Sequence, residues 1–244
     1  MAKAAAAKAV GIAPFTGFTK QTIAFYRDLA KHNEREWFEA HRDNYMNDVI
    51  APAQSFIVSM GGKVAKLSGG LQANPDYNGK GSFKKIFTDV RYNQDRNPYK
   101  TWMDIMFWEG TRKSKKDNSA FYLRMNPEKL WLVAGIKGFD NSLLKGWRAE
   151  MANTAKQKAA KAVVDKLRKG GYEILGETYK TLPRGASEDG PMPELQKYSG
   201  FYAVHEEKLP DVVYSEKLLE HCLKHYKAML PLHQLMVGIA EKHK

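Results

Sequence analysis

Two segments near the middle of this 244-residue chain constrain its fold more than any other feature. Residues 120–125 alternate apolar and polar side chains, residues 130–137 form a second extended run, and Asn126-Pro127-Glu128-Lys129 joins the two. Alternation with a period of two is typical of a strand that buries one face. A short connection of turn-forming residues between two such runs is typical of a hairpin. The sequence therefore predicts an antiparallel β-hairpin at its centre.

Helical patterns lie on both sides of this hairpin. Ile23, Tyr26 and Leu29 recur at helical spacing after Thr19, a residue type that caps helices, and Asn33-Glu34-Arg35-Glu36 has the spacing of a capping box. The predicted helices begin at or near Thr19, Asn33, Pro52, Asp140, Ala152 and Ser215. Helices at both ends with antiparallel strands between them predict an α+β fold, in which the helices pack on a central antiparallel sheet.

The remaining patterns fit one domain. Residues 172–175 and 201–205 are short strand candidates, and the last helix is expected to bend or break at Pro231. No Pro/Ser-rich linker interrupts the sequence. We therefore expect a single α+β domain over residues 15–244, preceded by a disordered leader over residues 1–14 that is rich in Ala and Lys.

Composition narrows the functional classes. No apolar run approaches the roughly 18 residues needed to span a bilayer, and Cys222 is the only cysteine, which excludes an intrachain disulfide and a multi-cysteine metal site. These features favour a cytoplasmic protein with no membrane association. The common dinucleotide, phosphate-loop, zinc-protease and serine-hydrolase motifs are absent. No cofactor is expected, and whether the protein is an enzyme stays open.

Charge is the second compositional signal. Thirty-nine Lys and Arg against 27 Asp and Glu give a formal net charge of +12. Residues 80–116 hold ten basic residues against four acidic ones, and residues 145–169 hold eight against two. Such surfaces attract polyanions, so a nucleic-acid-binding module is one hypothesis. The alternative is a charge that only keeps the protein soluble.

The segment Lys84–Lys100 is the most unusual in the chain. It holds five cations, two carboxylates and two tyrosines in seventeen residues. Its charges need polar partners, whereas its apolar residues Ile86, Phe87 and Val90 favour burial. A segment of this composition is expected to lie half-buried, with its charges held against each other or against a ligand.

This segment resembles the signature of a widespread uncharacterised microbial family, a domain of unknown function, whose pattern is R-x-x-R-D-x-R-[FY]-x-x-[DN]-K-x-x-Y-K. The matching residues are Asp89, Arg91, Tyr92, Asp95, Tyr99 and Lys100. Lys85 and Thr88 stand where the family has arginine, and Arg96 stands where it has lysine. Residues 33–38 and 182–185 are also similar to the family. The resemblance runs from about Phe15 to the C-terminal helix and implies no known activity.

The same segment supplies the candidate site. If it is extended, Asp89 and Arg91 share one face, so that the carboxylate can orient the guanidinium toward a phosphate or carboxylate. Asp95 would become a general base if desolvation raised its pKa. The predicted ligand-binding residues are Lys85, Asp89, Arg91, Tyr92, Asp95, Tyr99, Lys100 and Arg184. The alternative is an ion-pair network that only fixes the fold.

Two histidine patterns contain residue types that can ligate a metal. His221 and His225 are spaced at i, i+4 in the last predicted helix, but Lys217 and Lys224 lie close to them in the sequence and would repel a cation. His205-Glu206-Glu207 is a shorter pattern at the end of a predicted strand. Neither completes a ligand set from the sequence alone, so no metal is expected.

The basic composition makes a direct prediction about nucleic acid. At low ionic strength the protein should be retained by a short DNA or RNA duplex, and moderate salt should abolish this retention because counterion release dominates non-specific binding. A salt titration of an electrophoretic or anisotropy assay measures it. Retention that persists at high salt would favour a specific nucleic-acid module, and no retention at low salt would remove that hypothesis.

Overall fold

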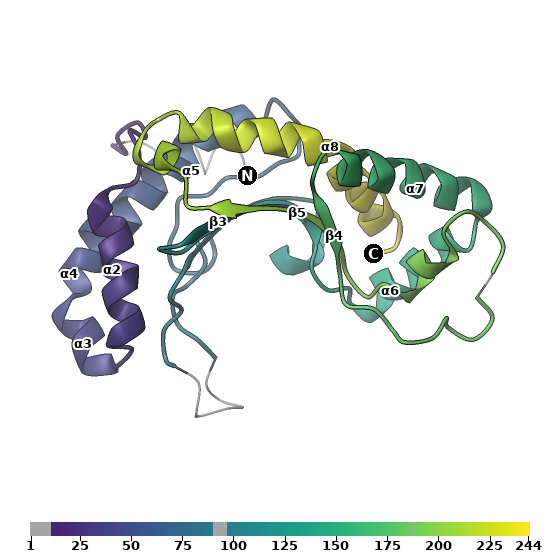
Figure 1. The fold of residues 1–244 in the computed structure, drawn as a ribbon, viewed down its shortest axis with the longest axis horizontal. Coiled ribbons are helices and arrows are strands. Elements are labelled where there is room, and N and C mark those ends of the chain that lie inside the picture. Colours follow the sequence, from purple (N-terminus) through teal and green to yellow (C-terminus); the bar gives the residue numbers. More distant parts are fainter. Residues whose placement is uncertain (1–10, 90–96, 187) are drawn as a thin grey trace. The chain divides into compact units, whose positions relative to one another are not determined.

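The computed structural model describes residues 11–89, 97–186 and 188–244 (Figure 1). The N-terminal half carries α2 (Lys20–Lys31), α3 (Arg35–Ala40), α4 (Arg42–Asn44), the π-helix η1 (Tyr45–Ile50) and α5 (Ala51–Val64). The strands are β1 (Met103–Glu109), β2 (Ser119–Met125), β3 (Lys129–Ile136), β4 (Glu173–Leu175) and β5 (Phe201–Lys208). The later helices are η2 (Lys115–Asp117), α6 (Asn141–Met151), α7 (Thr154–Lys169), η3 (Pro193–Lys197), η4 (Asp211–Tyr214) and α8 (Leu218–Lys242).

The five strands form one antiparallel sheet in the order β1-β2-β3-β5-β4. The predicted hairpin is present as β2 and β3. Its turn is closed by Asn126, whose backbone N–H donates to the carbonyl of Lys129 and whose side-chain oxygen accepts from the N–H groups of Glu128 and Lys129. Helices before and after the strands confirm the predicted α+β fold.

The chain groups into two compact units. Unit 1 contains residues 1–107, 122–131 and 206–224, and unit 2 contains residues 108–121, 132–205 and 225–244. Residues 1–10 of the predicted leader lie outside the described part of the chain. The single-domain boundary at residue 15 stays a prediction.

In unit 1 the first helices form where a residue that favours a helix start is followed by apolar residues at helical spacing. Thr19 caps α2 together with Thr22, whose hydroxyl also donates to the carbonyl of Asp48 at 2.5 Å. Ile23 and Leu29 of α2 are buried. Proline occupies the first turn of α5, where no backbone donor is required.

The expected capping box at Asn33 is wrong. Glu34 is the N-cap of α3, and no side-chain cap bond is made there. The side chain of Asn33 instead bonds the backbone of Tyr99, at 2.9 Å from its Nδ2 to the carbonyl and 3.0 Å from the Tyr99 N–H to its Oδ1. The Asn33 side chain, which the local pattern predicted to cap the helix, therefore makes its hydrogen bonds to Tyr99.

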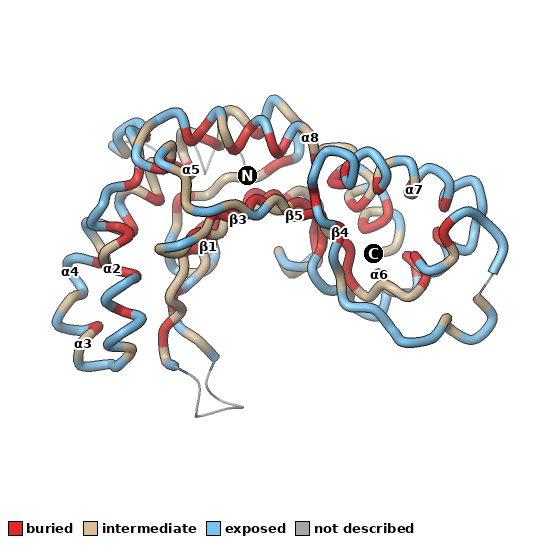
Figure 2. Tube along the Cα trace, in the orientation of Figure 1, coloured by how far each residue is buried: buried red, intermediate tan, exposed pale blue. Residues whose placement is uncertain are grey.

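Unit 2 is built around Trp147 of α6. This side chain is fully buried, and its indole N–H donates to the carbonyl of Leu195 at 2.7 Å. Asp140 caps α6, as expected. The buried positions of α7 (Gln157, Ala160, Val164 and Leu167) recur at helical spacing along one side of the helix (Figure 2).

The end of α8 is fastened by a carboxylate in unit 2. Burial alone would raise the pKa of Glu150, but hydrogen bonds from Lys156, Lys242 and His243 lower it to about 2. The helix is not broken at Pro231 and continues to Lys242. The buried side chains around the proline, such as Met229 and Leu232, keep the helix packed despite the lost backbone hydrogen bond. Within the described ranges, none of the helices is long and apolar enough to cross a membrane.

Two glycines of unit 1 make a matched test of the fold. Gly17 has a φ of 127°, and a Cβ added there would lie 2.4 Å from the carbonyl carbon of Tyr214. Gly17→Ala should therefore lower the free energy of unfolding by more than about 1 kcal/mol. Gly62→Ala, in helix α5 with open space around it, should raise it by about 0.5–1 kcal/mol. Urea denaturation of both variants measures the difference, and equal effects would contradict the close approach at Gly17.

Candidate functional site

The described arms of the Lys84–Lys100 segment form an antiparallel ribbon in unit 1. The N–H of Thr88 donates to the carbonyl of Pro98, and the N–H of Lys100 donates to the carbonyl of Ile86, both at 2.8 Å. The ribbon continues into the edge of β1, where the N–H of Lys84 donates to the carbonyl of Asp104 at 3.0 Å. The site hypothesis rests on an extended stretch from Asp89 to Arg91, and Arg91 lies outside the described residues, so that part of it stays a prediction.

The N-terminal helices fix this ribbon at Tyr99. The two bonds from the Asn33 amide hold the Tyr99 backbone, and the ring of Phe38 stacks on the Tyr99 ring with 4.3 Å between centroids. Burial raises the pKa of the Tyr99 hydroxyl, and Glu39 adds to the shift. Tyr99 is thus held neutral against α3, and the residue that follows it, Lys100, is positioned with it.

A buried carboxylate lies where the ribbon meets the sheet. Asp104 of β1 accepts two hydrogen bonds from Arg124 of β2, at 2.7 Å from Nε and 2.9 Å from Nη2. It also accepts from the indole N–H of Trp102 at 3.1 Å. The Asp104 side chain is 7% exposed, whereas that of Arg124 is 41% exposed. A bidentate pair of this kind fixes the plane of the guanidinium.

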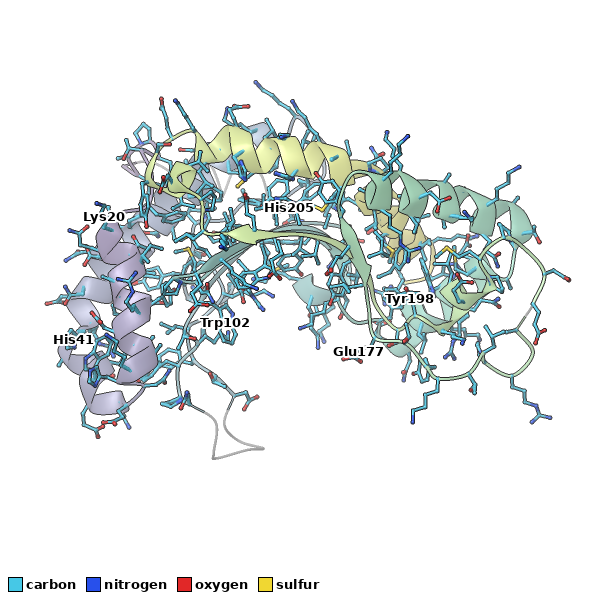
Figure 3. The ribbon with its side chains drawn as sticks, in the orientation of Figure 1. Lys20, His41, Trp102, Glu177, Tyr198 and His205 are labelled. Atoms are coloured by element: carbon cyan, nitrogen blue, oxygen red, sulfur yellow. The ribbon has the colours of Figure 1, made fainter. Side chains whose placement is uncertain are left out.

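The aromatic ring of Trp102 supports the same guanidinium from another direction. The Arg124 Cζ atom lies 5.1 Å from the Trp102 ring centroid, within the range of a cation–π contact. Trp102, which is labelled in Figure 3, is the residue before β1 in the sequence. Arg124 is therefore oriented by a carboxylate and by an aromatic face while a large part of it still meets solvent.

One lysine of the ribbon, Lys100, lies close to this pair, and a second, Lys84, lies over the ring of Tyr122. Lys100 is half-buried and donates to the carbonyl of Lys85 at 2.6 Å. Burial lowers the pKa of Lys100, Asp104 acts in the opposite direction, and the charge of Arg124 lowers it further. The Nζ atom of Lys84 lies 4.8 Å from the ring centroid of Tyr122, a residue of β2.

Tyr122 completes this surface of the sheet. Burial, with a smaller contribution from Asp104, raises the pKa of its hydroxyl. The phenol is therefore neutral and can act as a hydrogen-bond donor at neutral pH. We call Lys84, Lys100, Trp102, Asp104, Tyr122 and Arg124 the sheet-edge cluster. Its members include three cationic residues and one carboxylate.

The predicted site residues are distributed as follows. Lys85 and Asp89 are exposed on the ribbon, Tyr99 is buried and Lys100 is half-buried. Arg91, Tyr92 and Asp95 lie outside the described residues. Arg184 is exposed and belongs to unit 2. Of the predicted set, Lys100 is the residue whose side chain joins the sheet-edge cluster among the parts of the chain that are described.

The arrangement expected of Asp89 and Arg91 is found at Asp104 and Arg124, which the sequence reasoning missed. Two signals pointed to them. Asp104 is a lone carboxylate inside the apolar run Met103–Trp108, and such a charge requires a partner. Arg124 alternates with buried Leu123 and Met125 in the predicted hairpin, so its side chain emerges on the opposite face.

The contribution of Asp104 to the free energy of unfolding can be compared with that of Glu39, the carboxylate of a second arginine pair in unit 1. Asp104→Asn should lower the free energy of unfolding by about 1–3 kcal/mol, because a buried acceptor of charged hydrogen bonds is weakened. Glu39→Gln alters the exposed pair of Glu39 with Arg42 and should leave unfolding unchanged. Chemical denaturation of both variants is the measurement. Equal stability of Asp104→Asn and wild type would show that the buried pair does not support the fold.

Comparison with known proteins places the chain in a family. A family model described as a conserved hypothetical protein, DUF2461, matches residues 21–235. No curated protein matches the chain. The matched range contains the Lys84–Lys100 segment, the sheet-edge cluster and most of both units. Since the model covers most of the sequence, the chain belongs to the DUF2461 family of conserved hypothetical proteins.

Proposed function

We propose that unit 1 binds a small oxyanion, a phosphate or a carboxylate, at the sheet-edge cluster. The observation that carries the proposal is Arg124, a guanidinium oriented by buried Asp104 and by Trp102 while 41% of its side chain stays exposed. Asp104 engages Nε and one N–H of Nη2. The remaining guanidinium donors have the spacing that suits two oxygens of one anion.

The charge balance of the cluster supports this proposal. Lys100 is partly desolvated near a second cation, which disfavours its charged form. An arrangement that lowers the pKa of a lysine in this way is common at functional sites. A bound anion would relieve the repulsion between Lys100 and Arg124 and would replace the water that they lose.

The motif residues stay part of the proposal. Arg91, which lies outside the described residues, was expected to be the principal anion donor, with Asp89 orienting it, Tyr92 adding a hydrogen bond and Asp95 available as a base. Arg184 belongs to unit 2, and its role in ligand binding stays a prediction. Whether the anion is only bound or also transformed is left to experiment, and a cytoplasmic location stays a prediction.

Thermal scans with inorganic phosphate and with citrate test the proposal. Wild type should melt at a higher temperature when either anion is added, because a ligand that binds the native state stabilises it. Arg124→Lys and Arg91→Lys keep the charge but lose the planar fork, so each should lose most of the ligand-induced rise. Without ligand, Arg91→Lys should melt near wild type, whereas Arg124→Lys should melt at a lower temperature because a lysine cannot make both hydrogen bonds to Asp104. Quenching or a shift of Trp102 fluorescence, absent in Trp102→Phe, reports binding at the cluster itself.

Arg42→Lys is the matched control. Arg42 also makes a bidentate pair with a carboxylate, Glu39, but on the exposed surface of α3 and α4. This variant should respond to anions as wild type does. No stabilisation of wild type by either anion, or an unchanged response in Arg124→Lys, would contradict the proposal. Binding of a DNA or RNA duplex that survives moderate salt would instead favour a nucleic-acid module.

A further inference from the structure

A second polar cluster lies in unit 2 and takes no part in the proposed anion site. The imidazoles of His205 on β5 and His225 on α8 lie face to face, with 3.9 Å between ring centroids and 18° between planes. Their ligand nitrogens lie within 4.8 Å of each other. His225 is 7% exposed, and His205 is half-buried. Figure 3 labels His205 on β5.

A tyrosine orients one of these rings. The hydroxyl of Tyr172, a buried residue that precedes β4, lies 2.9 Å from Nδ1 of His225. When Nδ1–H of His225 donates to the phenol oxygen, Nε2 carries the lone pair. Histidines that bind metals are commonly held in this way, by a hydrogen bond at the second ring nitrogen.

The chemistry of the cluster suits a transition metal. Two imidazoles at short range, one of them hydrogen-bonded at Nδ1 to a phenol, provide the nitrogen donors that zinc, copper and nickel prefer. Glu207, two residues after His205 on β5, belongs to unit 1, where its carboxylate accepts a hydrogen bond from His221 at 2.5 Å. The proposed ligands in unit 2 are therefore the two imidazoles.

We propose that His205 and His225 are ligands of a divalent transition metal, zinc in the first instance, and that Tyr172 is a positioning residue for His225. The sequence pointed to His221 and His225 as the pair to consider. The fold pairs His225 with His205 instead, and it pairs His221 with Glu207. The sequence analysis expected no metal at either of its two histidine patterns, and the structure brings one residue of each pattern, His205 and His225, into contact.

Calorimetric titration of the full chain with ZnCl2 after treatment with a chelator tests the proposal. We expect one saturable site per chain, and a Co²⁺-loaded sample with visible d–d absorption that excess Zn²⁺ removes. His205→Ala, at the half-buried position, should weaken Zn²⁺ binding by at least about 10-fold. Tyr172→Phe should weaken it by about 10–100-fold, as the loss of an orienting hydrogen bond does, with the far-UV spectrum unchanged.

His32→Ala is the control, because His32 is an exposed histidine of unit 1 that stacks on Trp37 and has no place in the cluster. Its Zn²⁺ affinity should equal that of wild type. His225 is buried, so His225→Asn is added as a variant closer in shape, and it should also lose binding. The proposal is overturned if wild type shows no saturable Zn²⁺ binding, or if the folded His205→Ala protein binds Zn²⁺ as wild type does.

Discussion

Asp104 is a carboxylate inside a buried strand, and the arrangement of unit 1 follows from the need to satisfy it. An unpaired charge at this depth would be prohibitively unfavourable. Arg124 and Trp102 supply three donors to its two oxygens, so one interaction ties the start of β1 to β2 and to the residue before the strand. The exposed half of Arg124 is then held in a fixed orientation at the edge of the sheet. The same hydrogen bonds that stabilise the buried carboxylate of Asp104 therefore orient the guanidinium of the candidate site.

The N-terminal helices add a second constraint on the same surface. Asn33 holds the backbone of Tyr99 and Phe38 stacks on its ring, so α3 fixes the ribbon that delivers Lys100 to Arg124. Two of the segments that resemble the family, residues 33–38 and 84–100, therefore meet in space within unit 1. Residues 33–38 hold Tyr99 of the second segment in place, which gives a physical reason for the two segments to occur together.

The two proposed sites differ in the chemistry of their ligands and in the residue that orients each binding group. The sheet-edge cluster in unit 1 presents a guanidinium and two lysines and is proposed for an oxyanion, whereas the histidine pair in unit 2 presents imidazole nitrogens and is proposed for a metal cation. Each has its own orienting group, Asp104 for Arg124 and Tyr172 for His225. Arg124→Lys therefore tests anion binding and His205→Ala tests metal binding. Either proposal can be contradicted without affecting the other.

The sequence by itself determined the α+β class, the central hairpin, the caps at Thr19 and Asp140, and the family, because these depend on local periodicity and on short motifs. Only the tertiary structure decided the partners of the polar groups. Asn33 left its helix cap for Tyr99, His225 met His205 rather than His221, and Asp104 found Arg124 about twenty residues away. Local patterns cannot predict such pairs, since a buried polar group bonds whichever partner the packing of distant elements brings within reach.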